Sequence, residues 1–112
     1  MKKFFHKKLI RDKIPRIIEK NKGKYEVRIM KDKEFKRELK KKLIEEAKEI
    51  MGAGKSDLAK ELADVLELIK SIGESENISF NTIEKKQKQR RKERGGFKKR
   101  IFLIWSDKPA GK

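Results

Sequence analysis

Two clusters of acidic residues near the middle of the chain have the spacing of metal ligands on helices. The first reads Glu45-Glu46-x-x-Glu49 and the second reads Glu61-x-x-Asp64. Residues three or four apart lie on the same side of a helix, so each cluster predicts two carboxylates one turn apart. Proteins commonly bind Mg²⁺ through a few carboxylates together with substrate phosphates. The spacing therefore predicts a divalent metal centre.

The apolar residues around the first cluster indicate which way its acids face. Leu39, Leu43 and Ile50 form an apolar stripe. On a helical wheel that advances about 100° per residue, Glu46 lies within about 20° of the centre of that stripe and Glu49 about 80° from it. An acid thus occupies a position where a core residue is expected.

The second cluster repeats this pattern, because Glu61 and Asp64 flank a stripe of apolar residues: Leu58, Leu62, Val65, Ile69 and Ile72. Two carboxylates about 4 Å apart repel each other by roughly 4 kcal/mol at an effective dielectric constant near 20. Protons, a Lys or Arg partner, or a hard cation must offset that repulsion. For Glu45, which lies farther round its helix, an ordinary solvated position is expected.

Composition limits the kinds of metal and of protein. The 112 residues include no cysteine and one histidine, His6, so a metal must take oxygen ligands, which favours Mg²⁺ with Mn²⁺ as the alternative. The sequence contains neither an apolar run of membrane-spanning length nor a signal peptide. We therefore expect a cytoplasmic protein that does not enter a membrane.

The formal net charge of +16 predicts an anionic partner, either nucleic acid, an acidic membrane surface or a small polyphosphate. Lys and Arg concentrate near the N-terminus, over residues 36–42 and over residues 85–100. Four basic residues beside predicted turns are candidates for binding substrate phosphates: Arg11, Lys13, Arg94 and Lys98.

The patterning predicts a mainly all-α helical bundle with a short N-terminal strand and turn segment and a basic C-terminal extension. Helices are expected over residues 15–21, 32–51, 57–72 and 79–94. Asp32 and either Ser56 or Asp57 are the expected N-caps, and Gly73 and Gly95 the expected stops. Alternation over residues 25–30 predicts a strand, and residues 101–105 a closing strand or a segment across the bundle. One domain over 1–105 and a disordered tail over 106–112 are expected.

Glu45-Glu46-x-x-Glu49 followed by Glu61-x-x-Asp64 resembles the EExxE…ExxD signature of the MazG-type all-α nucleoside triphosphate pyrophosphohydrolases. Two further motifs, Lys8-Leu9-Ile10-Arg11-Asp12-Lys13-Ile14-Pro15 and Arg94-Gly95-Gly96-Phe97, resemble those of a phosphoribosyl-ATP pyrophosphohydrolase-like subgroup. The resemblance covers nearly the whole chain.

This resemblance implies a homodimeric or homotetrameric helical enzyme that cleaves a nucleoside triphosphate between its α and β phosphates, in a house-cleaning role for the nucleotide pool. It implies four Mg²⁺ ligands: Glu46, Glu49, Glu61 and Asp64. Glu46 and Glu49 would be the catalytic carboxylates, whereas Glu45 is the less certain first acid of the motif.

Other functions stay open at this point. Phosphoribosyl-ATP is an alternative substrate, although Val65-Leu66 stands where dedicated hydrolases of that compound often have a Tyr-His pair. A basic nucleic-acid-binding module without catalysis would use residues 85–100 together with Phe97, Phe102 and Trp105. The basic charge also predicts some nonspecific affinity for nucleic acid as a side activity. A purely structural helical adaptor is the third alternative.

Overall fold

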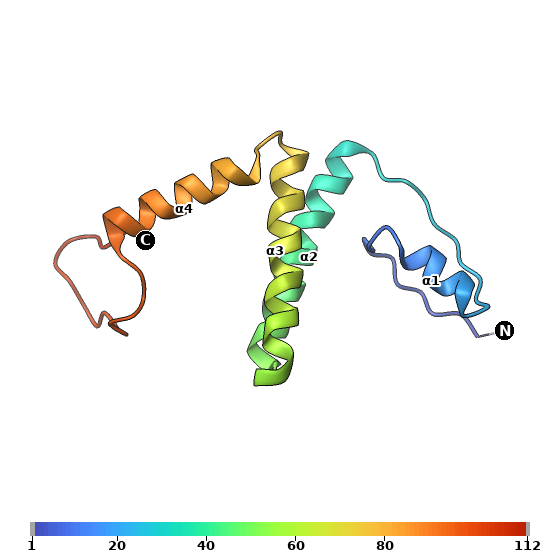
Figure 1. Ribbon diagram of the computed structural model, residues 1–112, viewed down its shortest axis with the longest axis horizontal. Coiled ribbons are helices and arrows are strands. Elements are labelled where there is room, and N and C mark those ends of the chain that lie inside the picture. Colours follow the sequence, from blue (N-terminus) through green and yellow to red (C-terminus); the bar gives the residue numbers. More distant parts are fainter. Residues whose placement is uncertain (1, 112) are drawn as a thin grey trace. The chain divides into compact units, whose positions relative to one another are not determined.

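All of the regular secondary structure in the described part of the chain is α-helix. A computed structural model describes residues 2–111, and within them it contains four helices and no β-strand. The helices are α1 (Ile14–Lys20), α2 (Asp32–Gly52), α3 (Lys55–Ser75) and α4 (Phe80–Arg94) (Figure 1). The predicted all-α class is confirmed.

Two compact units make up the chain, Met1–Phe80 and Asn81–Lys112. The first contains α1, α2 and α3. The second contains α4 except for its first residue, Phe80. The predicted single domain over residues 1–105 and the predicted disordered tail stay predictions, and each unit is described by itself below.

Helices α2 and α3 form an antiparallel hairpin of two 21-residue helices (Figure 1). Only Ala53 and Gly54 separate them, and both have extended backbone angles. So short a connection forces consecutive helices to pack side by side in opposite directions. Leu39 of α2 and Leu68 of α3 are the most buried apolar residues, with exposed fractions of 3% and 7%.

The helix ends differ slightly from the predictions. Lys31 is the N-cap of α2, and Asp32 lies in its first turn, where its carboxylate suits the positive end of the helix dipole. Gly54 is the N-cap of α3, in place of Ser56 or Asp57. Helix α3 also continues through Gly73, which is buried, and ends at Ser75.

Neither predicted strand is present. Residues 25–30 and 101–105 have no regular secondary structure, because a strand needs a hydrogen-bonding partner and the described residues offer none. Ile29, predicted to lie on an apolar side, is 93% exposed. Instead, Arg28 donates two hydrogen bonds of 2.7 Å to the Glu34 carboxylate and so ties this segment to the first turn of α2.

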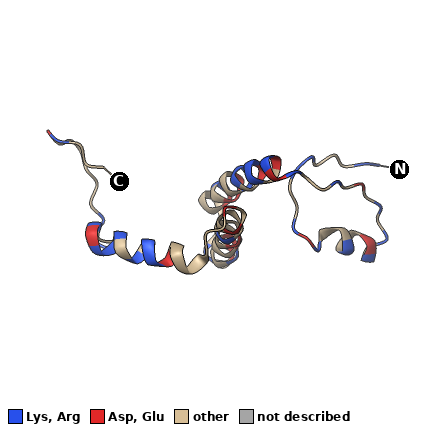
Figure 2. Ribbon diagram, turned by 90° about the horizontal axis from the view of Figure 1, so that it is seen from above, with Lys and Arg blue, Asp and Glu red and all other residues tan. Residues whose placement is uncertain are grey.

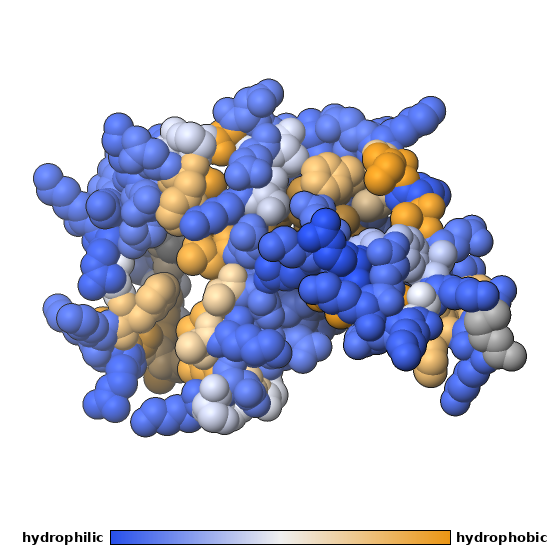
Figure 3. All heavy atoms as spheres, turned by 45° about the vertical axis from the view of Figure 1, so that its right-hand side comes forward, coloured by the Kyte–Doolittle hydropathy of each residue, from blue (hydrophilic) through white to orange (hydrophobic). Residues whose placement is uncertain are grey.

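The hairpin leaves much of its apolar surface uncovered. Ile44, Met51 and Leu62 are each at least half exposed, and Figure 3 shows apolar side chains reaching the surface between hydrophilic ones. The predicted place of Leu62 within the buried stripe is therefore wrong for this unit, since α3 faces α2 through Leu68. No helix in the described part of the chain has both the length and the apolar composition needed to cross a bilayer.

Candidate metal centre

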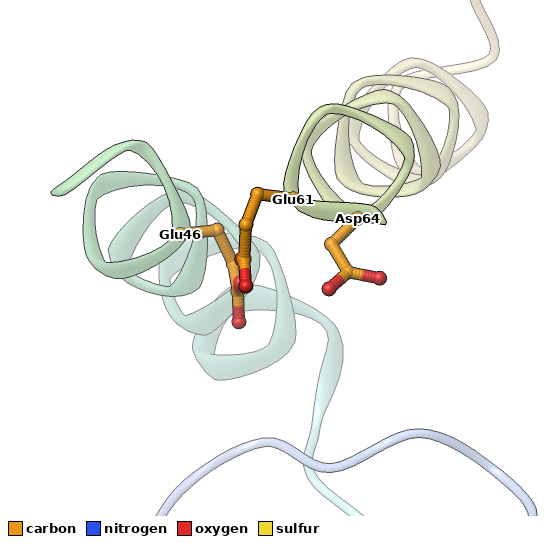
Figure 4. A group of neighbouring side chains, drawn as sticks. All are labelled: Glu46, Glu61 and Asp64. Carbon is orange, nitrogen blue, oxygen red and sulfur yellow. The ribbon is translucent and has the colours of Figure 1, made fainter. Parts of the chain in front are cut away.

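Three carboxylates from the two helices of the hairpin converge on one side of it. Glu46 comes from α2, and Glu61 and Asp64 come from α3. One oxygen of each lies within 4.8 Å of the oxygens of the other two. Figure 4 shows the Glu46 and Glu61 side chains approaching each other between the helices, with Asp64 beside them. We call these three residues the acidic triad.

The register of the hairpin accounts for this convergence. Glu46 lies seven residues before Ala53, and Glu61 lies seven residues after Gly54, so antiparallel packing brings them to the same level. Leu39 and Leu68 are each a further seven residues from the turn and form the buried layer next to it. Asp64 follows Glu61 by three residues and lies on the same side of α3.

The triad is partly shielded from water. The Glu61 side chain is 14% exposed and that of Asp64 is 28% exposed, and Glu46 is also half-buried. Two unit charges 4.8 Å apart repel each other by about 3 kcal/mol at an effective dielectric constant of 20. Three carboxylates this close together therefore require positive charge nearby.

The protein itself supplies only part of that charge. Arg11, in the segment before α1, donates a hydrogen bond of 2.8 Å from Nη2 to Asp64 Oδ1. Lys60 Nζ lies 4.0 Å from Glu61 Oε1. Within the described residues, the Glu46 carboxylate neither forms an ion pair nor accepts a hydrogen bond. The arrangement therefore leaves a negative region that a bound cation would neutralise.

The ligand types and their separation fit a hard divalent cation. All three ligands are carboxylate oxygens, which Mg²⁺ and Mn²⁺ prefer. Ligands on opposite sides of Mg²⁺ are about 4.2 Å apart, because each bond is about 2.1 Å long. The oxygens of the triad lie within 4.8 Å of one another, so small side-chain rotations bring them into range.

The structure places the other two acids of the first cluster outside the triad. Glu45 and Glu49 are both exposed. Glu49 instead lines a hollow of about 390 Å³ at the turn end of the hairpin, together with Glu61, Lys48 and Asp57. Three of the four predicted metal ligands thus come together, and Glu49 lies next to them across an open hollow.

The four predicted phosphate-binding residues lie in different places. Arg11 contacts the triad directly through Asp64. Lys13 is the exposed N-cap of α1. Arg94 and Lys98 belong to the second unit and line a separate hollow there. Spacing alone did not identify Lys48 and Asp57 as lining residues, since neither belongs to an acidic or apolar pattern.

Comparisons of the chain with protein-family models, with curated proteins and with solved structures find no match.

Proposed function

We propose that this protein is a Mg²⁺-dependent nucleoside triphosphate pyrophosphohydrolase, which hydrolyses its substrate to a nucleoside monophosphate and pyrophosphate. The convergence of Glu46, Glu61 and Asp64 within 4.8 Å is the observation that carries the proposal. Charged side chains at half-buried positions are normally paired, whereas of these three carboxylates Asp64 has a close basic partner, Glu61 a distant one and Glu46 none within the described residues. The sequence motifs that resemble the MazG-type signature contain the same three residues.

In this proposal Glu46, Glu61 and Asp64 would hold Mg²⁺, which would supply positive charge to the phosphates and lower the pKa of water. A water molecule attacks the α-phosphorus, and the bond from this phosphorus to the oxygen bridging it to the β-phosphorus breaks. The electron pair of that bond leaves with pyrophosphate. Glu49 is exposed and lines the same hollow as Glu61, and we assign to it the acceptance of the proton from the water.

Arg11 is the basic residue with the best-supported role at this site. Its guanidinium lies 2.8 Å from Asp64 and its side chain is 55% exposed, so it can turn toward a substrate. Arginine binds phosphate oxygens through two parallel hydrogen bonds. We assign to it the binding of the triphosphate next to the triad.

A second copy of the chain completes the apolar core in this proposal. Ile44 of α2 and Leu62 and Leu66 of α3 remain exposed in the single chain. Among residues 2–111, only Leu39 and Leu68 form a buried apolar core, which is small for a chain of this length. Association through the hairpin would bury those residues and produce the expected dimer or tetramer.

Product analysis with matched variants tests the catalytic proposal. The protein is incubated with ribo- and deoxyribonucleoside triphosphates and with phosphoribosyl-ATP, with and without Mg²⁺. We expect monophosphate and pyrophosphate only when Mg²⁺ is present, with loss of turnover in Glu46→Gln and Glu61→Gln. Glu45→Gln is the control, because it removes an exposed acid adjacent to the triad.

Equal activity in all three variants would contradict the assignment of the triad, and no turnover of any substrate would contradict the proposed function. If phosphoribosyl-ATP alone is hydrolysed, the chemistry stands and the house-cleaning role is wrong.

A further inference from the structure

More than half of the net charge belongs to the second unit, Asn81–Lys112. This unit contains twelve Lys and Arg residues and only three acidic residues, and therefore carries +9 of the total +16. Figure 2 shows an uncharged first turn of α4, followed by basic residues that alternate with uncharged ones toward its C-terminal end. A net charge of about 2 to 8 suits a whole small domain, whereas this unit carries +9 within 32 residues.

The basic residues of this unit that the structure describes have no carboxylate partners. Among residues 81–111, none of the Lys and Arg side chains forms an ion pair, and Glu93 accepts a hydrogen bond from the Gln89 amide instead. Helix α4 also has no buried residue. A helix that is polar on all sides does not pack into a core, so the charges of α4 face solvent.

The chain folds back at the end of α4 and brings several of the charges together. Gly95 adopts a positive φ of 84°, and its N–H donates a 2.7 Å hydrogen bond to the Arg91 carbonyl, which ends the helix. A turn follows, in which the Arg100 N–H donates to the Phe97 carbonyl at 3.1 Å.

These two turns border a hollow of about 480 Å³ in which basic side chains are the most numerous. Its lining side chains are five basic residues and two apolar ones: Arg91, Arg94, Lys98, Lys99, Arg100, Phe97 and Ile101. No acidic residue contributes to it. We call this group the cationic hollow.

Stabilisation of the helix end explains only part of this group. Cations are favourable within the last turn of a helix, which accounts for Arg91 and Arg94. It does not account for Lys98, Lys99 and Arg100, which follow the helix and add like charge to the same hollow. Repulsion among five cations is relieved by a polyanion. Phe97, in the same turn, is 96% exposed, so its ring is not part of an apolar core.

We propose that the cationic hollow binds single-stranded nucleic acid, with the five cations contacting phosphates and Phe97 stacking on a base. Basic grooves with exposed aromatic rings are the usual surfaces for single strands. A membrane surface fits less well, because helices that lie on bilayers have a distinct apolar face and α4 has none. This binding does not depend on the acidic triad or on nucleotide hydrolysis.

The number of phosphate contacts determines how strongly the affinity for a single strand should fall with salt. The logarithm of the affinity for a single strand falls by about 0.7 per phosphate contact for each tenfold increase in salt. Five contacts therefore predict a loss of about 100-fold between 50 and 200 mM salt. Fluorescence anisotropy of a labelled oligothymidylate of about 15 nucleotides, with the full chain, measures this dependence directly.

Two charge variants with the same net charge separate the hollow from general electrostatic attraction. The test variant replaces the five cations of the hollow with Gln: Arg91, Arg94, Lys98, Lys99 and Arg100. The control replaces five exposed lysines of the first unit that form no ion pair: Lys3, Lys8, Lys24, Lys33 and Lys40. We expect the test variant to lose most of the salt dependence and at least tenfold in affinity, and the control to lose less than threefold.

Phe97→Ala, compared with Phe5→Ala, tests the stacking contact. Both rings are largely exposed, and we expect only Phe97→Ala to weaken binding, by several-fold. Equal losses in the two charge variants, or no binding by the unaltered chain, would overturn the proposal. Anionic phosphatidylserine vesicles are the comparison ligand: hollow-dependent binding to vesicles without binding to the oligonucleotide would overturn it as well.

Discussion

Removal of one carboxylate from the triad should stabilise the protein without metal and destabilise it, relative to the unaltered chain, with metal. Glu61→Gln is the substitution for this test, because the Glu61 side chain is only 14% exposed, compared with 28% for Asp64. Glutamine has nearly the same size and keeps polar atoms in the same place. The substitution therefore changes charge and little else.

The magnitude follows from the distances in the triad. At 4.8 Å, a unit charge pair is worth about 3 kcal/mol at an effective dielectric constant of 20 and about 1 kcal/mol in water. Arg11 already neutralises part of the charge of Asp64, and the site is open to solvent. We expect Glu61→Gln to stabilise the metal-free protein by about 1 kcal/mol, which raises Tm by roughly 4 °C.

Mg²⁺ should reverse this order. A ligand that binds only the folded state stabilises it by about 2.7 kcal/mol at a concentration 100 times its Kd. The unaltered chain should gain that stability, whereas Glu61→Gln should gain little. Thermal unfolding followed by circular dichroism, with Mg²⁺ or with a chelator, measures both effects, and the exposed Glu45→Gln is the control. If Glu61→Gln is less stable than the unaltered chain in chelator, or if Mg²⁺ raises Tm equally in all three proteins, the reasoning is refuted.

Three further predictions concern other parts of the structure. Arg11→Ala should raise KM for the triphosphate about tenfold with a smaller effect on kcat, and Arg11→Lys should recover only part of the loss, because lysine cannot bind phosphate through two parallel hydrogen bonds; steady-state kinetics measures both. The double substitution Leu62→Glu and Leu66→Glu should shift the sedimentation coefficient toward that of the monomer. An unchanged oligomer would exclude the exposed apolar face of α3 as the interface. Hydrogen bonds from Arg28 lower the pKa of Glu34, so the resulting stability is present above the unfolded-state pKa and is lost as the pH falls through the folded-state value. Arg28→Gln should therefore lower stability at neutral pH in urea unfolding and have little effect once the carboxyl is protonated in both states; a loss that is independent of pH would contradict this.

The hairpin and its triad were largely predictable, because both depend on local spacing. Leu39 and Glu46 are seven residues apart, as are Glu61 and Leu68, and the two pairs are arranged symmetrically about a short glycine-containing turn. An antiparallel hairpin then places leucine against leucine and glutamate against glutamate. Acidic residues at positions within or beside the apolar stripes indicated which residues of the two helices lie opposite each other.

Features that depend on distant parts of the chain were not predictable in the same way. Arg11 and Asp64 are 53 residues apart, and the segment carrying Arg11 has no regular structure that would fix its position. The alternation over residues 25–30 reports a local preference, whereas a strand also needs a partner elsewhere. Leu62 was misplaced because a helical wheel averages all apolar residues, including those left exposed on the single chain.

Hydrolysis of a nucleoside triphosphate in ¹⁸O-labelled water, with Mg²⁺ present, tests the central claim most directly. Attack on the α-phosphorus predicts that the unaltered chain places the label in the nucleoside monophosphate and none in pyrophosphate. Glu61→Gln should yield no labelled product. Label in pyrophosphate or in inorganic phosphate, or no hydrolysis at all, would contradict the account.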